Sequence, residues 1–337
     1  MKYKYCENMN NHLCFNGNRI LYCTTGNNTK SNSNLTIKEN FDGSDFDINE
    51  YFDNTEKLRN DCKKGNIINN CEGCHYLLEK DWDENTFERK IKYILISNYR
   101  ACNSKCIYCI SRSDYNPKNI KNDTYNILPV IADMINKKAI TKDTKIDFAG
   151  GECTLYPYFE ELLQLLIQAD VKDIIIHTNA IIYSKAIELG IKKGIVSICV
   201  STDSGTRKIH EKVKGVKTYN TVWNNIKKYR KAEGKTLDNK VCVKYILVEN
   251  INDNEKEIEE WIKKAVRNNI NILRFNADND IFIKYQKNDN NNHPYLAKII
   301  VLSEFFVKTA QKYNVKYILD YNIDAAYKML NINMPHF

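Results

Sequence analysis

The sequence predicts an α/β protein in which six strands alternate with helices. From residue 90 onward, short runs of β-branched and apolar residues recur, and each is followed by a longer amphipathic segment. Polar and glycine-rich residues come directly after several of these runs. Strand–helix alternation implies a parallel sheet with right-handed crossovers. Functional side chains collect at the carboxyl ends of the strands in such folds.

The predicted elements can be placed by their hydrophobic spacing. We expect strands at 91–96, 144–149, 173–177, 195–201, 241–248 and 271–275. We expect helices at 125–138, 158–169, 183–193, 219–232 and 254–268. A further helix at 295–313 and a strand at 315–319 follow. The expected domains are a cysteine-rich unit at 1–80, a core at 90–280 and an extension at 281–337.

Composition limits the class of protein. The 337 residues carry a formal net charge of +8 and include 12 cysteines. The N-terminus lacks an apolar signal core and no apolar run is long enough to span a membrane, so we expect a cytoplasmic protein without membrane contact. In that reducing compartment cysteines favour metal or redox chemistry over disulfides. The basic charge follows amphipathic helices, and no arginine tract supports nucleic-acid binding.

Three cysteines, Cys102, Cys106 and Cys109, stand at CxxxCxxC spacing directly after the first predicted core strand. Three thiolates on one loop can bind three irons of a [4Fe–4S] cube. The fourth iron then keeps an open coordination position, as in a catalytic rather than a structural metal site. A structural zinc knuckle or buried thiols are the alternatives.

Two polar groups follow later strands. Gly150 and Gly151 allow a ligand to approach the backbone closely, and Glu152 suits an ammonium group; a simple strand-end turn is the alternative. Ser201 and Asp203 follow the fourth strand and suit the vicinal hydroxyls of a ribose, the alternative for Asp203 being a helix cap. Strand alternation places Ser201 on one face with Cys199.

Together these motifs resemble the radical S-adenosylmethionine (SAM) superfamily over residues 90–280. The resemblance implies a partial (β/α)6 TIM-like barrel, a [4Fe–4S] cluster, and reductive cleavage of SAM to a 5′-deoxyadenosyl radical that abstracts a substrate hydrogen. It implies cluster ligands Cys102, Cys106 and Cys109, and SAM contacts from Tyr108, Gly150, Gly151, Glu152, Asn179, Ser201 and Asp203. Asn252 resembles the strand-five exit of the peptide-modifying branch.

The N-terminal cysteines resemble the SPASM-type auxiliary-cluster domain, here placed before the barrel. A hairpin with an Asn16-Gly17 turn and a helix at 49–61 are expected within it. The expected ligands of an auxiliary [4Fe–4S] cluster are Cys6, Cys23, Cys71 and Cys74, with Cys62 as a rival and Cys14 as a packed thiol. A zinc site with the same cysteines is the alternative, because both metals take thiolate ligands.

The expected function is radical SAM modification of a peptide or protein, with an electron donor such as flavodoxin or ferredoxin. One alternative is modification of a small molecule or of a sugar in a surface-polysaccharide pathway. An alternative of a different class is a non-catalytic zinc or iron–sulfur binding protein. Cys153 and Cys199 are candidate hydrogen-atom donors, and core packing is the alternative for each.

Overall fold

The computed structural model describes residues 3–6, 11–23, 36–66, 71, 77–80, 87–109, 124–234, 240–279, 281 and 294–334. The chain divides into two compact units. Unit 1 contains Met1–Ala101 and Asn116–Ile175, and unit 2 contains Cys102–Tyr115 and Ile176–Phe337. Strand β8 (Asp173–Thr178) begins in unit 1 and ends in unit 2.

The sheet of unit 1 joins the N-terminal hairpin to the first core strands. In spatial order its strands are β4 (Thr36–Lys38), β3 (Arg19–Leu21), β2 (His12–Asn16), β6 (Tyr93–Ser97) and β7 (Lys145–Phe148). The predicted hairpin is confirmed, because β2 and β3 pair antiparallel and Gly17 turns between them at φ +55°. Strand β2 also pairs parallel with β6. This sheet therefore continues across the domain boundary predicted near residue 80.

Three α-helices, a short 3-10 helix (Cys153–Leu155) and a small strand pair belong to the described part of unit 1. The α-helices are α1 (Ile48–Lys63), α2 (Leu128–Asn136) and α3 (Phe159–Gln168). Asp47 caps α1 by accepting a hydrogen bond from the Asn49 amide. Strands β1 (Tyr3–Tyr5) and β5 (Leu78–Lys80) pair antiparallel, and β1 packs against α1. Both short strands lie outside the sequence prediction.

Unit 2 contains a parallel sheet with one apolar and one polar face. Its strands run in the order β9 (Val196–Ser201), β10 (Val241–Leu247), β11 (Ile272–Ala277) and β12 (Lys316–Leu319). Along β10, Val243 and Tyr245 are fully buried, whereas Cys242 and Lys244 are half-buried. This alternation has the period of two that a strand imposes, and it separates an apolar face from a polar one.

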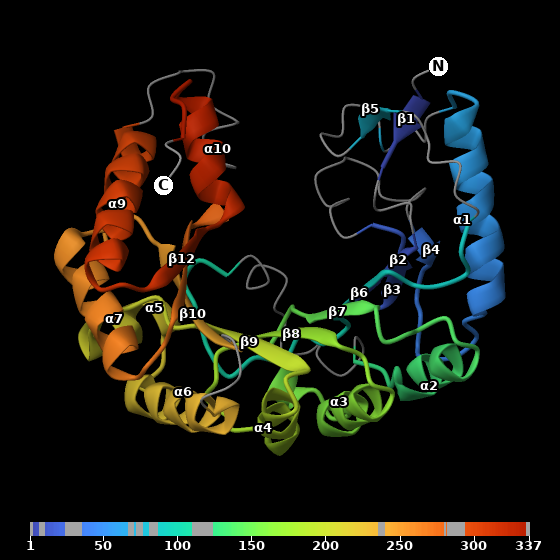
Figure 1. Ribbon diagram of the computed structural model, residues 1–337, viewed down its shortest axis with the longest axis horizontal. Coiled ribbons are helices and arrows are strands. Elements are labelled where there is room, and N and C mark those ends of the chain that lie inside the picture. Colours follow the sequence, from blue (N-terminus) through green and yellow to red (C-terminus); the bar gives the residue numbers. More distant parts are fainter. Residues whose placement is uncertain are drawn as a thin grey trace. The chain divides into compact units, whose positions relative to one another are not determined.

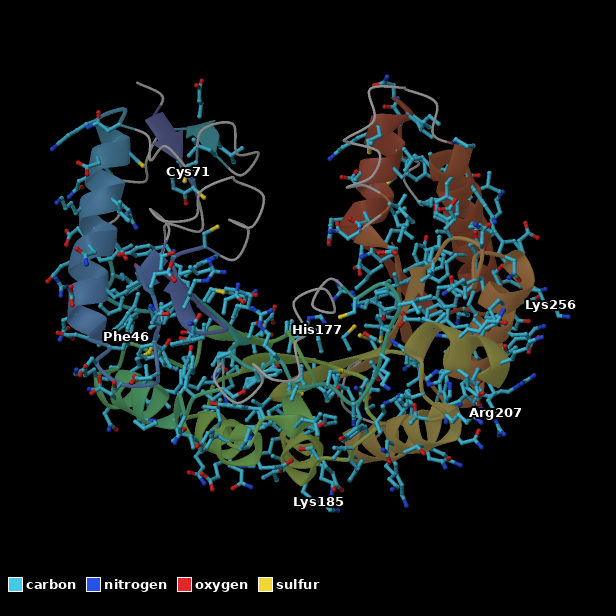
Figure 2. The ribbon with its side chains drawn as sticks, turned by 180° about the vertical axis from the view of Figure 1, so that it is seen from behind. Phe46, Cys71, His177, Lys185, Arg207 and Lys256 are labelled. Carbon is cyan, nitrogen blue, oxygen red and sulfur yellow. The ribbon has the colours of Figure 1, made fainter. Side chains whose placement is uncertain are left out.

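Helices cover the apolar face of that sheet (Figure 1). They are α4 (Lys185–Lys192), α6 (Tyr219–Glu233), α7 (Glu255–Arg267) and α9 (Pro294–Lys312). Stacked aromatic rings seal the layers, as where Phe275 of β11 meets Phe306 of α9 at 4.4 Å between centroids. The polar face lies on the other side, where Figure 2 shows His177 turned away from Lys185 of α4.

The predicted fold class is confirmed: strands alternate with helices around a parallel sheet, as a partial TIM-like barrel requires. Two helices of unit 2, α5 (Arg207–Lys214) and α10 (Tyr321–Met329), were not expected from the sequence. Within the described residues, none of the helices combines the length and the apolar character that crossing a membrane demands.

Candidate functional site

The three-cysteine loop opens unit 2. Cys102 and Cys106 are partly buried and Cys109 is exposed. The amide of Cys109 donates to the carbonyl of Cys106 at 3.3 Å, which closes a tight turn at the end of the loop. One loop therefore presents all three thiols, two of them partly buried and one exposed.

Hydrogen-bond donors surround the first of these thiols. The Sγ atom of Cys102 accepts from the Ser104 amide at 3.4 Å and from Nδ2 of Asn179 at 3.8 Å. Asn179, directly after β8, also donates to Oδ1 of Asn103 at 2.7 Å. Donors of this kind stabilise a thiolate and tune the potential of a bound cluster. The soft thiolate set and its N–H donors fit a [4Fe–4S] cluster held by Cys102, Cys106 and Cys109.

The far end of the loop is attached to helix α5. The amides of Lys105 and Ile107 donate to the carbonyls of Lys214 and Val213 at 2.8 and 3.1 Å. Gly215 ends α5 at φ +66°, and a β-carbon there would lie 2.8 Å from Cβ of Lys105. A glycine is therefore needed both for the left-handed turn and for the close approach.

Tyr108 and Asp203, both predicted SAM contacts, meet directly. The Tyr108 hydroxyl donates to Oδ2 of Asp203 at 2.6 Å. Asp203 is fully buried and forms an ion pair with Lys214 of α5. Ser201 is half-buried at the end of β9. The contacts of Tyr108, Ser201 and Asp203 with SAM remain predictions. Ser201 is more exposed than Asp203.

The glycine pair of unit 1 lies against the backbone that leads into the cysteine loop. A β-carbon on Gly151 would stand 2.5 Å from the carbonyl oxygen of Ala101, the residue before Cys102. Gly150 has φ +120°, and a β-carbon there would lie 2.6 Å from Oγ of Ser97. The amide of Glu152 donates to the Ala101 carbonyl at 2.7 Å. Close packing against the protein thus requires a glycine at both positions, and their contact with SAM remains a prediction.

Glu152 is 1% exposed. Its Oε1 atom accepts hydrogen bonds from the amide and the hydroxyl of Thr154. Through the bond to that amide, Glu152 caps the short helix at Cys153–Leu155. Its predicted contact with the ammonium group of SAM remains a prediction. Cys153 is fully buried beside it, and burial followed by the neighbouring Glu152 carboxylate raises the pKa of the Cys153 thiol well above its usual value.

The second candidate hydrogen donor has a different environment. Cys199 of β9 lies directly opposite Cys242 of β10 in the parallel ladder. A hydrogen bond from Cys242, aided by His177 and Lys244, lowers the pKa of Cys199 well below the usual thiol value although burial opposes the shift. Of the two candidates, Cys199 is the one on the polar face, because strand alternation places it with Ser201.

Cationic side chains gather on the same polar face. Lys244 of β10 and Arg274 of β11 are directly opposite each other. Arg274 donates to Oδ1 of Asp320 at 3.0 and 2.6 Å. Among the residues that the structure describes, no carboxylate pairs with the ammonium group of Lys244. This face can therefore attract an anionic group.

The N-terminal cysteines also come together. Cys6, Cys62 and Cys71 are buried in one cluster with Tyr5, and Cys23 packs against it. Figure 2 labels Cys71 close to the β1 strand. Burial raises the pKa of the Cys62 thiol. Cys62, expected only as a rival ligand, thus lies among the predicted ligands, whereas the predicted ligand Cys74 falls outside the described residues.

A site for a single metal ion needs a different arrangement of ligands from an iron–sulfur cube. Within the described ranges, no three His, Cys, Asp or Glu side chains form a group of the kind that encloses one metal ion. In an iron–sulfur cube each thiolate binds a different iron, so cube ligands need not converge on one point. The auxiliary cluster and its ligand set remain predictions.

Sequence reasoning missed Lys214 altogether. The helix that carries it shows only Ile209 and Val213 as large apolar residues among charged ones. Their spacing of four was the available signal, and it is too short a pattern to predict a helix. Asn252 was noticed, and it donates to the carbonyls of Asp203 and Ile246 at 3.0 and 2.8 Å.

The parallel α/β fold and the three-cysteine loop after its first core strand define an iron–sulfur protein of the partial-barrel class. Residues 96–263 match the sequence profile of the radical SAM superfamily. The chain belongs to this superfamily, whose cofactors are a [4Fe–4S] cluster and SAM.

Curated relatives match part of the chain. It is 27% identical over 191 residues to a GTP 3′,8-cyclase of Mannheimia succiniciproducens, covering 53% of this chain and 52% of the relative. It is 28% identical over 179 residues to the GTP 3′,8-cyclase of Haemophilus influenzae, covering 52% of this chain and 51% of the relative. The chain thus spans about half the length of the curated relatives it matches.

Solved structures share the fold. SuiB of Streptococcus suis bound to SAM superposes with a TM-score of 0.53 at 18% identity, covering 90% of this chain and 60% of SuiB. SuiB bound to its precursor peptide SuiA gives a TM-score of 0.52 at 14% identity, covering 99% of this chain and 77% of SuiB. At these identities the likeness concerns the fold.

Proposed function

We propose that the protein is a radical SAM enzyme that cleaves SAM reductively and uses the resulting radical to abstract a hydrogen atom from a substrate. The observation that carries this proposal is the cysteine loop, whose Cys102 thiol accepts two N–H donors and whose backbone is held by α5. When bound, the cluster supplies one electron to SAM, which yields methionine and the 5′-deoxyadenosyl radical. A flavodoxin or a ferredoxin would supply that electron.

The chain's own residues would orient the cysteine loop, bind the ribose of SAM and protect the radical from water. Asn179 orients the loop through its contacts with Cys102 and Asn103. Ser201 presents a hydroxyl at the carboxyl end of β9, where it can bind a ribose. Helices cover the other face of the sheet and would keep water from reaching the radical through that face, because a radical intermediate must be protected from solvent.

For the substrate, the polar face favours a small anionic molecule. Lys244 and Arg274 are neighbours across β10 and β11, and His177 of β8 lies close to Cys199 on this face. A phosphate or carboxylate would be bound by these cations. The likeness to enzymes named GTP 3′,8-cyclase supports the same choice. The expectation from the sequence is a peptide or protein substrate. A peptide with an acidic side chain meets the same charge requirement and is the second candidate.

Cys199 and Cys242, opposite each other on the polar face, are the proposed source of a hydrogen atom should the reaction return one to the substrate radical. Cys242 keeps its proton there, because its hydrogen bond to Cys199 and its burial raise its pKa well above the usual thiol value. Cys153 lies elsewhere, beside Glu152. In the N-terminal segment we propose an auxiliary iron–sulfur cluster bound by cysteines drawn from Cys6, Cys23, Cys62, Cys71 and Cys74.

The test is formation of 5′-deoxyadenosine from SAM by the anaerobically reconstituted protein under a strong reductant. We expect product from the wild type and none from Cys106→Ala, because that variant loses a cluster ligand. A wild-type protein that carries zinc in place of iron, or that forms no 5′-deoxyadenosine, would refute the proposal.

The same assay probes the substrate class when GTP is added as a nucleotide probe. We expect GTP to bind and to raise the yield of 5′-deoxyadenosine in the wild type, and Lys244→Met to weaken GTP binding about tenfold through loss of one charge contact. Lys256→Met, on the outer helix α7, is the matched control. Stimulation by an acidic peptide but not by GTP would favour the second candidate.

A further inference from the structure

A buried ion pair lies directly behind the cysteine loop. The side chains of Lys214 and Asp203 are 3% and 0% exposed and form a salt bridge. Tyr108, from within the loop, donates to Oδ2 of Asp203 at 2.6 Å and accepts from Nζ of Lys214 at 2.9 Å. Three side chains from the loop, from the end of β9 and from α5 therefore share one closed set of hydrogen bonds.

Both carboxylate oxygens of Asp203 accept hydrogen bonds from the protein. Its Oδ1 atom accepts from the Ile246 amide at 2.8 Å, and Oδ2 accepts from both Tyr108 and Lys214. Its carbonyl accepts from Asn252 at 3.0 Å. The enclosed carboxylate thus acts on other groups of the protein, among them a residue of the cysteine loop.

Lys214 contacts the loop in two ways. Its carbonyl accepts from the Lys105 amide at 2.8 Å, so the end of the helix and the loop are joined through the backbone. Its ammonium group donates to the Tyr108 hydroxyl, so the same residue also holds the loop through its side chain.

We propose that Lys214 and Asp203 are a positioning pair that holds Tyr108 and the cysteine loop in the shape that receives the cluster. This inference rests on the proposed function. Replacing a buried ion pair by apolar residues often leaves stability unchanged or improves it. The position of this buried pair beside the three expected cluster ligands is accounted for by the geometry that it gives the loop.

A double-mutant cycle tests the pair. The variants are Lys214→Met, Asp203→Asn, the double variant, and Lys214→Arg; Lys298→Met, which breaks an ion pair with Asp253 elsewhere in unit 2, is the control. Each single variant leaves one buried group without its partner, so we expect both to unfold at lower urea than the double variant. Lys214→Arg should retain most of the wild-type stability.

Cluster binding shows whether the Lys214–Asp203 pair positions the loop or only stabilises the folded protein. After anaerobic reconstitution, we expect Lys214→Met and the double variant to bind several-fold less iron at the loop and to show an altered EPR signal of the reduced cluster. Lys298→Met should match the wild type. A double variant that regains both stability and the wild-type EPR signal would overturn the proposal, as would a Lys214→Met protein with unchanged iron and signal.

A measurement on the protein without any cluster distinguishes failure of this proposal from failure of the proposed function. Lys105 lies in the loop and is exposed, so trypsin can cut there when the loop detaches from α5. In the full chain without iron, we expect cleavage after Lys105 to be several-fold faster in Lys214→Met than in the wild type. Equal rates would refute the positioning role, whereas a wild type that binds no cluster yet shows this difference would refute only the proposed function.

Discussion

His210 of α5 is a buried, uncharged imidazole close to the positioning pair. Its Nδ1 atom lies 3.4 Å from Oγ of Ser204, and its Nε2 atom lies 3.2 Å from Oγ1 of Thr218. Burial, followed by the charge of Lys214, lowers the pKa of His210 to about 4. The neutral ring therefore belongs to the native state.

This depressed pKa predicts a loss of stability in mild acid. Between pH 6.5 and 4 the unfolded chain binds a proton at this histidine and the folded chain does not, so stability falls as pH falls. We expect the contribution of His210 to drop by about 2 kcal/mol between about pH 7 and about pH 5. Urea unfolding at both pH values measures it, and His210→Gln should show a smaller decrease; an equal decrease in both proteins would contradict the assignment.

At the scale of elements, the residues that follow strand β7 pack against the segment that joins β6 to the cysteine loop. The amides of Gly151 and Glu152 donate to the carbonyls of Tyr99 and Ala101. No side chain fits at residue 151, because a β-carbon would lie within 2.9 Å of three backbone atoms of Arg100 and Ala101. This contact fixes where the chain leaves unit 1.

We expect Gly151→Ala to lower stability by roughly 1–3 kcal/mol through overpacking and to reduce iron bound at Cys102, Cys106 and Cys109. Iron content and urea unfolding of the same preparation measure both effects. Gly65→Ala is the comparison: its φ of +87° strains the backbone, so stability falls, but no atom lies within 4 Å of the added carbon and nothing is overpacked. If Gly65→Ala loses as much iron as Gly151→Ala, the close approach is not the cause.

The core elements could be predicted from the sequence because their periodicity is strong. Strand β9 was expected at 195–201 and is found at Val196–Ser201, and α7 was expected at 254–268 and is found at Glu255–Arg267. The parallel pairing of β2 with β6 could not be predicted, since a hairpin pattern does not specify its third strand. Helix α5 escaped because its eight residues are mostly charged.

The candidate site was predictable in its motifs but not in its contacts. The sequence positions of Cys102, Cys106, Cys109 and Asn179 follow from spacing and resemblance. The bond between Lys214 and Tyr108 joins residues 106 positions apart, and no local pattern indicates it. Asp203 was expected at a ribose, and its protein partners emerge only from the fold.

Considered as a whole molecule, the chain has a second group of cysteines remote in sequence from the loop. Cys6, Cys62 and Cys71 are buried together, and Cys23 packs against them. Cys14 is buried on β2 and is not a member of this cluster. It therefore provides a control within the same segment.

We predict about eight irons per chain after anaerobic reconstitution, two cubes of four. Cys71→Ala and Cys62→Ala should each lower the iron content toward half while SAM cleavage persists, and Cys14→Ala should retain all the iron. Iron analysis and 5′-deoxyadenosine formation measure the two outcomes. Unchanged iron in Cys71→Ala would remove this residue from the ligand set.

The cysteine loop belongs to unit 2, although the segments on both sides of it belong to unit 1. During synthesis the loop therefore leaves the ribosome long before the residues that hold it, Asn179 and Lys214. The chain must be made through α5 before these thiols can take up their final arrangement. Metal loading should accordingly follow the emergence of α5, and a nascent chain stalled before α5 should leave these cysteines reactive toward alkylating reagents.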